Sequence, residues 1–248
     1  MKKAYLDGQR EWQLNIEGGK IMYIPFFILA IALTLFAQFW VNATYKKYAK
    51  VSNRKGYTGE AVAKELLRTA GIYDVSVEMI GGRLTDHYDP RSKVLRLSKD
   101  VYSSTSVAAL GVAAHETGHA IQDSTDYAFL RLRGIMVPVT NISSRLSIPL
   151  VFIGMLFSGN TGYTLMMLGV FLFAIMMIFT LITLPVEFNA SSRAIHLLSD
   201  YNFLDEDELV GAKKVLKAAA LTYVAAAAVS VANFLRLLAM ANSSRNRN

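Results

Sequence analysis

The chain has 248 residues, which is enough for one ordinary domain or two small ones. Hydrophobic residues make up 53% of it, a share that is high for a soluble protein and prompts a search for membrane spans. The net charge of +7 comes from lysines and arginines that cluster beside the apolar segments, so we expect no nucleic-acid partner. Because the chain has no cysteine, disulfides and thiolate metal sites are excluded.

Four apolar segments are candidates for crossing a bilayer, which takes roughly 20 apolar residues in a helix. Residues 21–43 and 161–185 contain no charged side chain. Residues 138–158 and 218–241 are also apolar, although each includes one asparagine and one arginine. We therefore predict four transmembrane helices, with the lipid bilayer as a partner of the protein.

The segment before the first apolar stretch, residues 1–20, is a polar tail with mixed charges. Because the apolar stretch that follows is longer than that of a signal peptide, we expect an uncleaved anchor. Arg145, inside the second apolar segment, is either functional or reaches the cytoplasmic interface. A transporter or channel is a weaker interpretation, because no pair of apolar segments shows repeat symmetry.

The polar stretches between the spans predict a small α+β domain made of residues 56–133 and 186–217. Apolar spacing indicates a helix over residues 58–70, and alternating polarity indicates strands at 75–84 and 94–97. The run DHYDPRS between these strands is typical of a turn. Two further helices are predicted at residues 107–122 and 186–198.

The helix over residues 107–122 contains the pattern H-E-x-x-H, formed by His115, Glu116 and His119. Helical positions four apart share a face, so both imidazoles can reach one ion. A catalytic zinc site takes three protein ligands and leaves one position for water. Glu116 is the predicted base that takes a proton from this water. Chance produces such a match in fewer than ~1 chain in 100.

The third ligand has to come from elsewhere in the chain, and Glu187 is the strongest candidate. The helical face of Glu187 carries Ala190 and Ala194, which would let its helix press against the H-E-x-x-H helix. Two membrane crossings separate His119 from Glu187, so both lie on the same side of the membrane. The alternative is a glutamate favoured by the helix dipole after a proline, with Asp123 or His87 as the ligand.

At these residues the chain resembles the YugP-type membrane zinc metallopeptidases of bacteria, a neutral zinc metallopeptidase family. The resemblance extends over nearly the whole chain from the first span onward. It implies a mainly α fold in which four transmembrane helices carry a small α+β gluzincin-type domain, with one Zn²⁺ per chain. The matching stretches are GGRLTDHYDPRSKVLRLS, VAAHETGHAIQ, LRLRGIMVPVTNI, LPVEFNASSRA and AKKVLKAAALTYVAAA.

More distantly, the chain is similar to heat-shock membrane proteases and CAAX prenyl proteases, which carry E-x-x-A-D-x-x-A on a later helix. Glu187, Ala190 and Ala194 match that motif, but Ser191 stands where those enzymes have an aspartate that supports a ligand histidine. Asn189 and Ser191 are therefore candidates for this supporting role.

Two weaker expectations concern the strands. His87 or Tyr88 could donate a hydrogen bond to the oxyanion of the reaction, although turn chemistry is the preferred explanation of these residues. In a gluzincin fold, the strand at 94–97 is expected to pair with an extended substrate.

Orientation follows from the basic residues that follow the first span and those between the third and fourth spans, which lie on the side of the predicted domain, whereas the connection 158–162 is uncharged. The basic residues of the tail would have to cross the membrane, and its acidic residues offset some of their charge. We predict a multi-pass protein of the bacterial cell membrane with its active site facing the cytoplasm. The expected activity is zinc-dependent endoproteolysis of membrane proteins or peptides near that face. The alternative is a catalytically silent membrane scaffold with a structural metal site.

Overall fold

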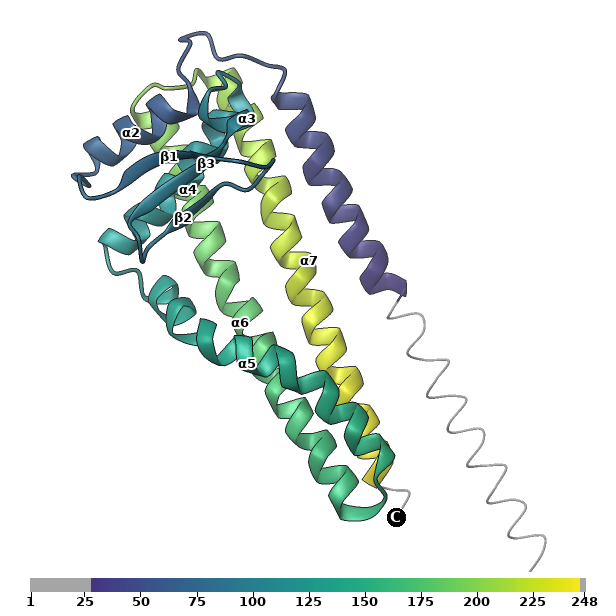
Figure 1. Cartoon of the computed structure of the whole chain (residues 1–248). Helices are drawn as coiled ribbons and strands as arrows, with labels where there is room; N and C mark the ends of the chain where they lie inside the picture. Colours follow the sequence, from purple (N-terminus) through teal and green to yellow (C-terminus); the bar gives the residue numbers. More distant parts are fainter. Residues whose placement is uncertain (1–27, 246–248) are drawn as a thin grey trace, which may run out of the picture.

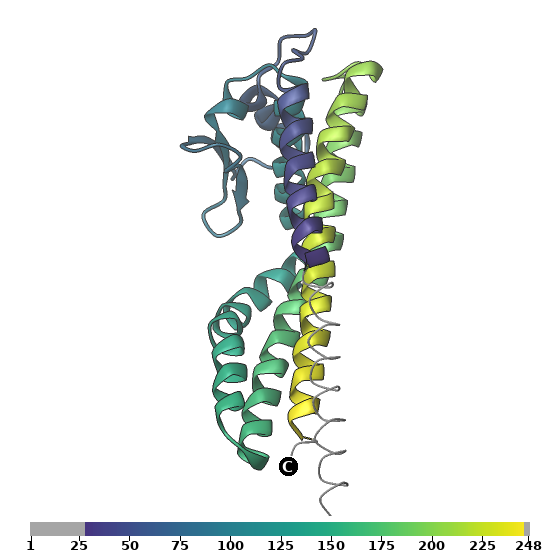
Figure 2. The same ribbon diagram turned by 90° about the vertical axis from the view of Figure 1, so that its right-hand side faces the viewer.

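The structure, a computed structural model, describes residues 28–245. Long helices run side by side, and a small α+β unit packs at one end of them (Figures 1 and 2). The elements in chain order are a first helix over Ile28–Tyr48, α2 (Gly59–Thr69), β1 (Ser76–Ile80), β2 (His87–Asp89), β3 (Val94–Ser98), α3 (Lys99–Tyr102), α4 (Val107–Ser124), α5 (Ala128–Leu156), α6 (Gly159–Asp200) and α7 (Glu206–Arg245).

Four of these helices are long and apolar enough to cross a membrane: the first helix, α5, α6 and α7. The predicted fold class, four such helices beside a small α+β unit, is therefore confirmed. The tail 1–20 and residues 21–27 of the first predicted span lie outside the described residues. The domain boundaries stay a prediction.

Helix α6 joins two segments that the sequence indicated separately, at 161–185 and 186–198. It has 42 residues, about twice the length that crosses a bilayer, so one end extends into the α+β unit. Pro185 lies inside it and lacks the N–H of a regular helical residue. Side chains from the neighbouring segment donate to the carbonyls here, Tyr127 to Pro185 and Gln122 to Val186.

The sheet has three strands in the order β1-β3-β2, with β1 parallel and β2 antiparallel to β3. The prediction that DHYDPRS is only a turn was wrong, because His87–Asp89 pairs with Val94–Arg96 as β2. The expectation that strand 94–97 pairs with substrate was also wrong. β3 is the central strand, and its backbone already bonds to β1 and β2 on its two sides.

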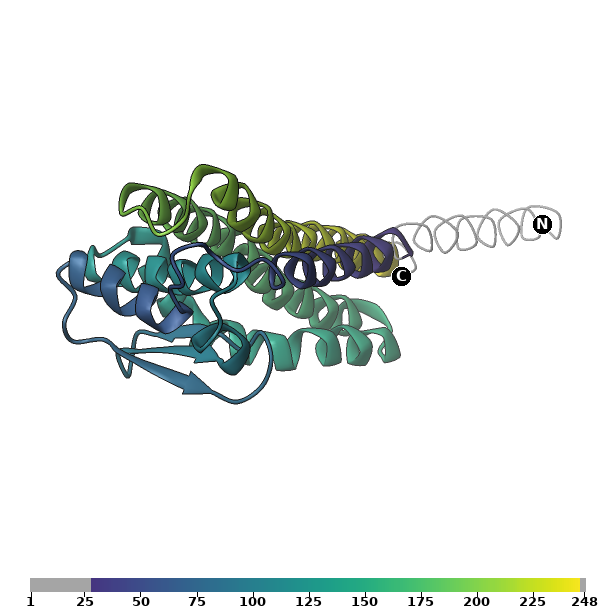
Figure 3. The same cartoon turned by 90° about the horizontal axis from the view of Figure 1, so that it is seen from above.

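Helix α4 is the centre of the α+β unit. Its side chains pack on α2 and the sheet in one core cluster, and on α6 and α7 in another. Viewed from above, the sheet and the α6–α7 layer lie on opposite sides of the unit (Figure 3). Ser106 caps α4 by accepting a hydrogen bond from the Ala109 N–H. The most buried core side chains include Leu66, Leu95, Leu97, Leu110 and Leu198.

Candidate metal centre

Helices α4 and α6 approach each other closely at Gly118. A Cβ added there would lie 2.8 Å from the Ala190 carbonyl oxygen, so only glycine fits. Ala190 and Ala194 are fully buried at this contact, as the small-residue pattern on α6 predicted. Because the backbones are so close, short side chains from both helices can meet.

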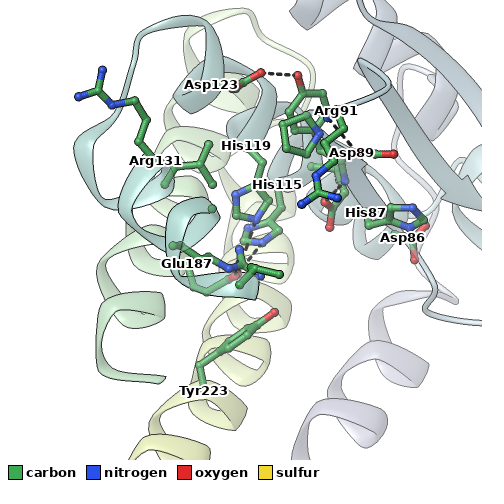
Figure 4. A pocket seen from close by; sticks show the side chains of 17 residues that line it. Asp86, His87, Asp89, Arg91, His115, His119, Asp123, Arg131, Glu187 and Tyr223 are labelled. Carbon is green, nitrogen blue, oxygen red and sulfur yellow. Dashed lines mark hydrogen bonds and ion pairs between the residues drawn. The ribbon is translucent and has the colours of Figure 1, made fainter. Parts of the chain in front are cut away.

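The side chains that meet are His115 and His119 from α4 and Glu187 from α6. Glu187 Oε2 is 3.3 Å from His115 Nε2 and 3.7 Å from His119 Nε2, and the three potential ligand atoms all lie within 4.8 Å of one another. Figure 4 shows both imidazoles over the Glu187 carboxylate. Glu187 is 2% exposed, and its Oε2 has no hydrogen-bond partner in the described part of the chain.

These residues fit a zinc ion. A buried carboxylate oxygen without a hydrogen-bond partner is costly unless a cation pairs with it. Two imidazole nitrogens and one carboxylate oxygen are a known ligand set for catalytic zinc. Asp123 and His87, the alternative third ligands, have other partners: Asp123 accepts from Tyr88 and Lys93, and His87 Nδ1 lies 2.8 Å from the Thr85 carbonyl.

Each histidine has a partner at its second ring nitrogen. His115 Nδ1 is 3.2 Å from Ser191 Oγ, and His119 Nδ1 is 3.0 Å from Gln122 Oε1. Such partners orient ligand imidazoles. Ser191 had been a candidate from the sequence, whereas Gln122 had been missed. Asn189, the other candidate, instead accepts hydrogen bonds from Gln122 Nε2 and Arg193 Nε.

Glu116 lies beside these groups and is tied to the edge of the sheet. It is 8% exposed, and its Oε2 accepts a 3.1 Å hydrogen bond from the Tyr88 N–H of β2. The Tyr88 hydroxyl donates to Asp123 at 2.7 Å, which ties β2 to α4. Burial, together with this bond, raises the pKa of Tyr88, so the phenol stays protonated. Burial also raises the pKa of nearby Asp86.

A cavity of about 770 Å³ opens over the cluster (Figure 4). β2 and α4 contribute to its lining, as do α5, α6 and α7. Arg133 of α5 brings its Nη1 to 3.4 Å from Glu187 Oε1. Tyr223 of α7 lines the same cavity, and its hydroxyl points toward Glu187 in Figure 4. The sequence analysis missed both residues. For Arg133, the available signal of a functional role was its position as a charged residue near the start of a membrane helix.

The fold and the cluster together define a membrane protein with a possible metal site of two histidines and one glutamate. Comparison with known proteins agrees. Residues 23–242 match the family described as "Putative neutral zinc metallopeptidase", and the chain belongs to this family.

The chain is 45% identical over 228 residues to the protein described as "Putative membrane protease YugP" of Bacillus subtilis (strain 168). That match covers 92% of this chain and 100% of the relative. No solved structure matches the chain.

Proposed function

We propose that the protein is a zinc-dependent endopeptidase whose metal ligands are His115, His119 and Glu187, with one Zn²⁺ per chain. The observation that supports this most is the placement of Glu116 beside the three ligands in one cavity. When bound, zinc would polarise the scissile carbonyl and lower the pKa of the attacking water.

Glu116 is the general base of the proposed reaction. Its carboxylate takes a proton from the water that attacks the scissile carbonyl, and the carboxylic acid then gives this proton to the departing amine. The hydrogen bond from the Tyr88 N–H holds the carboxylate in place before the reaction. Less conformational entropy of this side chain is therefore lost on reaching the transition state. A metal site with a purely structural role would have no use for a base at this position.

Arg133 and Tyr223 are the proposed donors to the developing oxyanion. Both belong to membrane helices, and both line the cavity near Glu187. Donors fixed in place before the reaction stabilise charge that appears only in the transition state. His87 and Tyr88 are less suited to this role, because His87 Nδ1 and the Tyr88 hydroxyl have partners of their own.

An extended substrate is proposed to pair with the outer edge of β2. This strand is an edge of the described sheet, and its residues Tyr88 and Asp89 line the cavity. Because the Tyr88 N–H already donates to Glu116, the pairing would use the other backbone groups of this edge. Main-chain pairing with a sheet edge binds peptides with little dependence on their side chains. The role that the sequence indicated for β3 would then belong to β2.

Substrates are proposed to be membrane proteins or peptides near the cytoplasmic face. Leu130, Gly134 and Val137 of α5 line the cavity together with residues of β2, so membrane helix and aqueous domain meet at the site. The basic residues beside the spans support a cytoplasmic location for this end of the protein.

The test is a comparison of the full-length protein with Glu116→Gln in detergent or nanodiscs, using casein and a model membrane substrate. Glutamine keeps the size of glutamate but cannot act as a base, so zinc content should be retained and cleavage lost. Glu206→Gln is the matched control, because Glu206 is exposed in the first turn of α7. Unimpaired cleavage by Glu116→Gln would overturn the mechanism and leave the silent scaffold as the better interpretation.

A further inference from the structure

Gln122 is a fully buried amide whose two ends both make hydrogen bonds. Its Oε1 lies 3.0 Å from His119 Nδ1. Its Nε2 donates to the Val186 carbonyl at 2.8 Å and to Asn189 Oδ1 at 3.0 Å. A buried polar side chain with all of these partners has little freedom to move.

The orientation of this amide follows from its partners. The Val186 carbonyl can only accept a hydrogen bond, so it requires the NH₂ end of Gln122. Asn189 Oδ1 is held as an acceptor as well, because Arg193 Nε donates to it at 2.8 Å. Exchanging the two ends of the Gln122 amide would place oxygen against two oxygens, so the carbonyl end must face His119.

The tautomer of His119 follows in turn. A carbonyl oxygen at Nδ1 requires a proton on that nitrogen, and the neutral ring then carries its lone pair on Nε2. Nε2 is the atom that points toward Glu187 Oε2, at 3.7 Å. The amide thus presents the ligating nitrogen of His119 in the form that can bind a metal.

The same amide also controls the position of the third ligand. Val186 immediately precedes Glu187 on α6, and its carbonyl accepts the hydrogen bond from Gln122 Nε2. A single side chain of α4 therefore contacts an α4 ligand and the backbone that carries the α6 ligand.

We propose that Gln122 is a positioning residue of the metal centre, which sets the tautomer of His119 and the alignment of Glu187 relative to it. This inference rests on the proposed zinc site and adds to it a residue that controls metal affinity. His115 differs, because its Ser191 partner is a hydroxyl that can donate or accept and so does not select a tautomer.

The first measurement is the zinc affinity of the full-length protein by competition with a chelator. Gln122→Met keeps the length of the side chain but removes the acceptor and both donors, and zinc affinity should fall by about 10-fold to 100-fold. Gln122→Glu keeps the acceptor for the His119 Nδ1–H but places its second oxygen against the Val186 carbonyl and Asn189 Oδ1, so it should recover only the part of the loss that comes from His119. Gln38→Met is the matched control, because Gln38 is exposed on the first helix.

Equal losses in Gln122→Met and Gln122→Glu would leave no effect for the acceptor that faces His119 and would overturn the role of Gln122 in setting the tautomer. An unchanged affinity in Gln122→Met would overturn it too. The second measurement is the ¹⁵N spectrum of the histidines in zinc-free protein, where the wild type should show His119 protonated at Nδ1. Gln122→Met should show a mixture of tautomers, and an unchanged spectrum would contradict the proposal.

The outcomes separate this inference from the proposed function. If the wild type binds zinc and Glu116→Gln loses cleavage, while Gln122→Met binds zinc like the wild type, only the role of Gln122 is overturned. If the wild type binds no zinc, the proposed function itself fails and the inference fails with it.

Discussion

Helix α6 makes two close contacts, one with α4 near its C-terminal end and one with α5 in its N-terminal half. Both depend on glycine. A Cβ on Gly118 of α4 would lie 2.8 Å from the Ala190 oxygen, and a Cβ on Gly169 of α6 would lie 2.6 Å from the Ser147 oxygen. The two contacts nevertheless differ in what surrounds them.

At the α4 contact, Glu187 and the amide of Gln122 are buried among hydrogen-bonding groups. At the α5 contact, most of the buried neighbours are apolar and include Val151, Met166 and Val170, and the buried Ser147 hydroxyl donates to Met176 Sδ. The close approach of helices therefore has a different role at each contact. In the α+β unit it brings ligands from two helices together, and in the membrane half it gives dispersion contacts where no hydrophobic driving force acts between helices.

The largest expected effect concerns the two ends of α6, which we place on opposite sides of the bilayer. Because the chain has no cysteine, single cysteines at Ser52 and Asn160 are clean probes, and both positions are exposed. An impermeant maleimide added to intact cells should label position 160 and leave position 52 protected until the cells are lysed. The reverse pattern would place the metal centre outside the cytoplasm and change the class of substrates.

Glu187→Ala removes the ligand that α6 contributes at the α4 contact. Zinc affinity should weaken by more than about 100-fold, the upper end of the cost of losing an outer-shell partner. Metal analysis of the purified full-length protein measures this, with Glu206→Ala as the exposed control. Full zinc occupancy in Glu187→Ala would redirect the assignment to Asp123 or His87.

Arg133→Gln tests whether a membrane helix contributes to the chemistry. Loss of one oxyanion donor should lower kcat by about 10² to 10³ with zinc still bound. Arg131→Gln is the control on the same helix, because Arg131 also lines the cavity but is exposed and points away from the cluster in Figure 4. Equal rates for the two variants would remove Arg133 from the mechanism, and Tyr223→Phe would then test the remaining donor.

The smallest expected effects come from the two glycines themselves. Gly118→Ala and Gly169→Ala should each destabilise the protein by about 1–3 kcal/mol through overpacking, measured as a lower melting temperature. Only Gly118→Ala should also lower activity at a temperature where both are folded, by about 10-fold to 100-fold, because it shifts ligands apart.

Gly81→Ala is the control for both glycine variants, since a Cβ there meets nothing within 4 Å. Equal activity losses in Gly118→Ala and Gly169→Ala would mean that the two halves of α6 are mechanically coupled. The contrast between the two contacts would then be lost.

The sequence by itself determined the four apolar helices and the pair of His115 and His119, because both depend on local spacing. The length of an apolar stretch can be counted in the sequence and compared with the thickness of a bilayer. The pattern H-E-x-x-H places two imidazoles on one face of any helix that contains it. The prediction of Glu187 needed one further argument: two membrane crossings separate it from His119, so both residues lie on the same side of the membrane.

Only the tertiary structure decided the surroundings of this cluster. Gln122 lies three residues after His119, but its role depends on a carbonyl 64 positions away, on another helix. Arg133 and Tyr223 reach the cavity because α5 and α7 both pass beside α6. β2 was missed because a strand of three residues has no readable alternation and exists only through its pairing with β3. Such contacts join segments far apart in the chain, so no local sequence pattern predicts them.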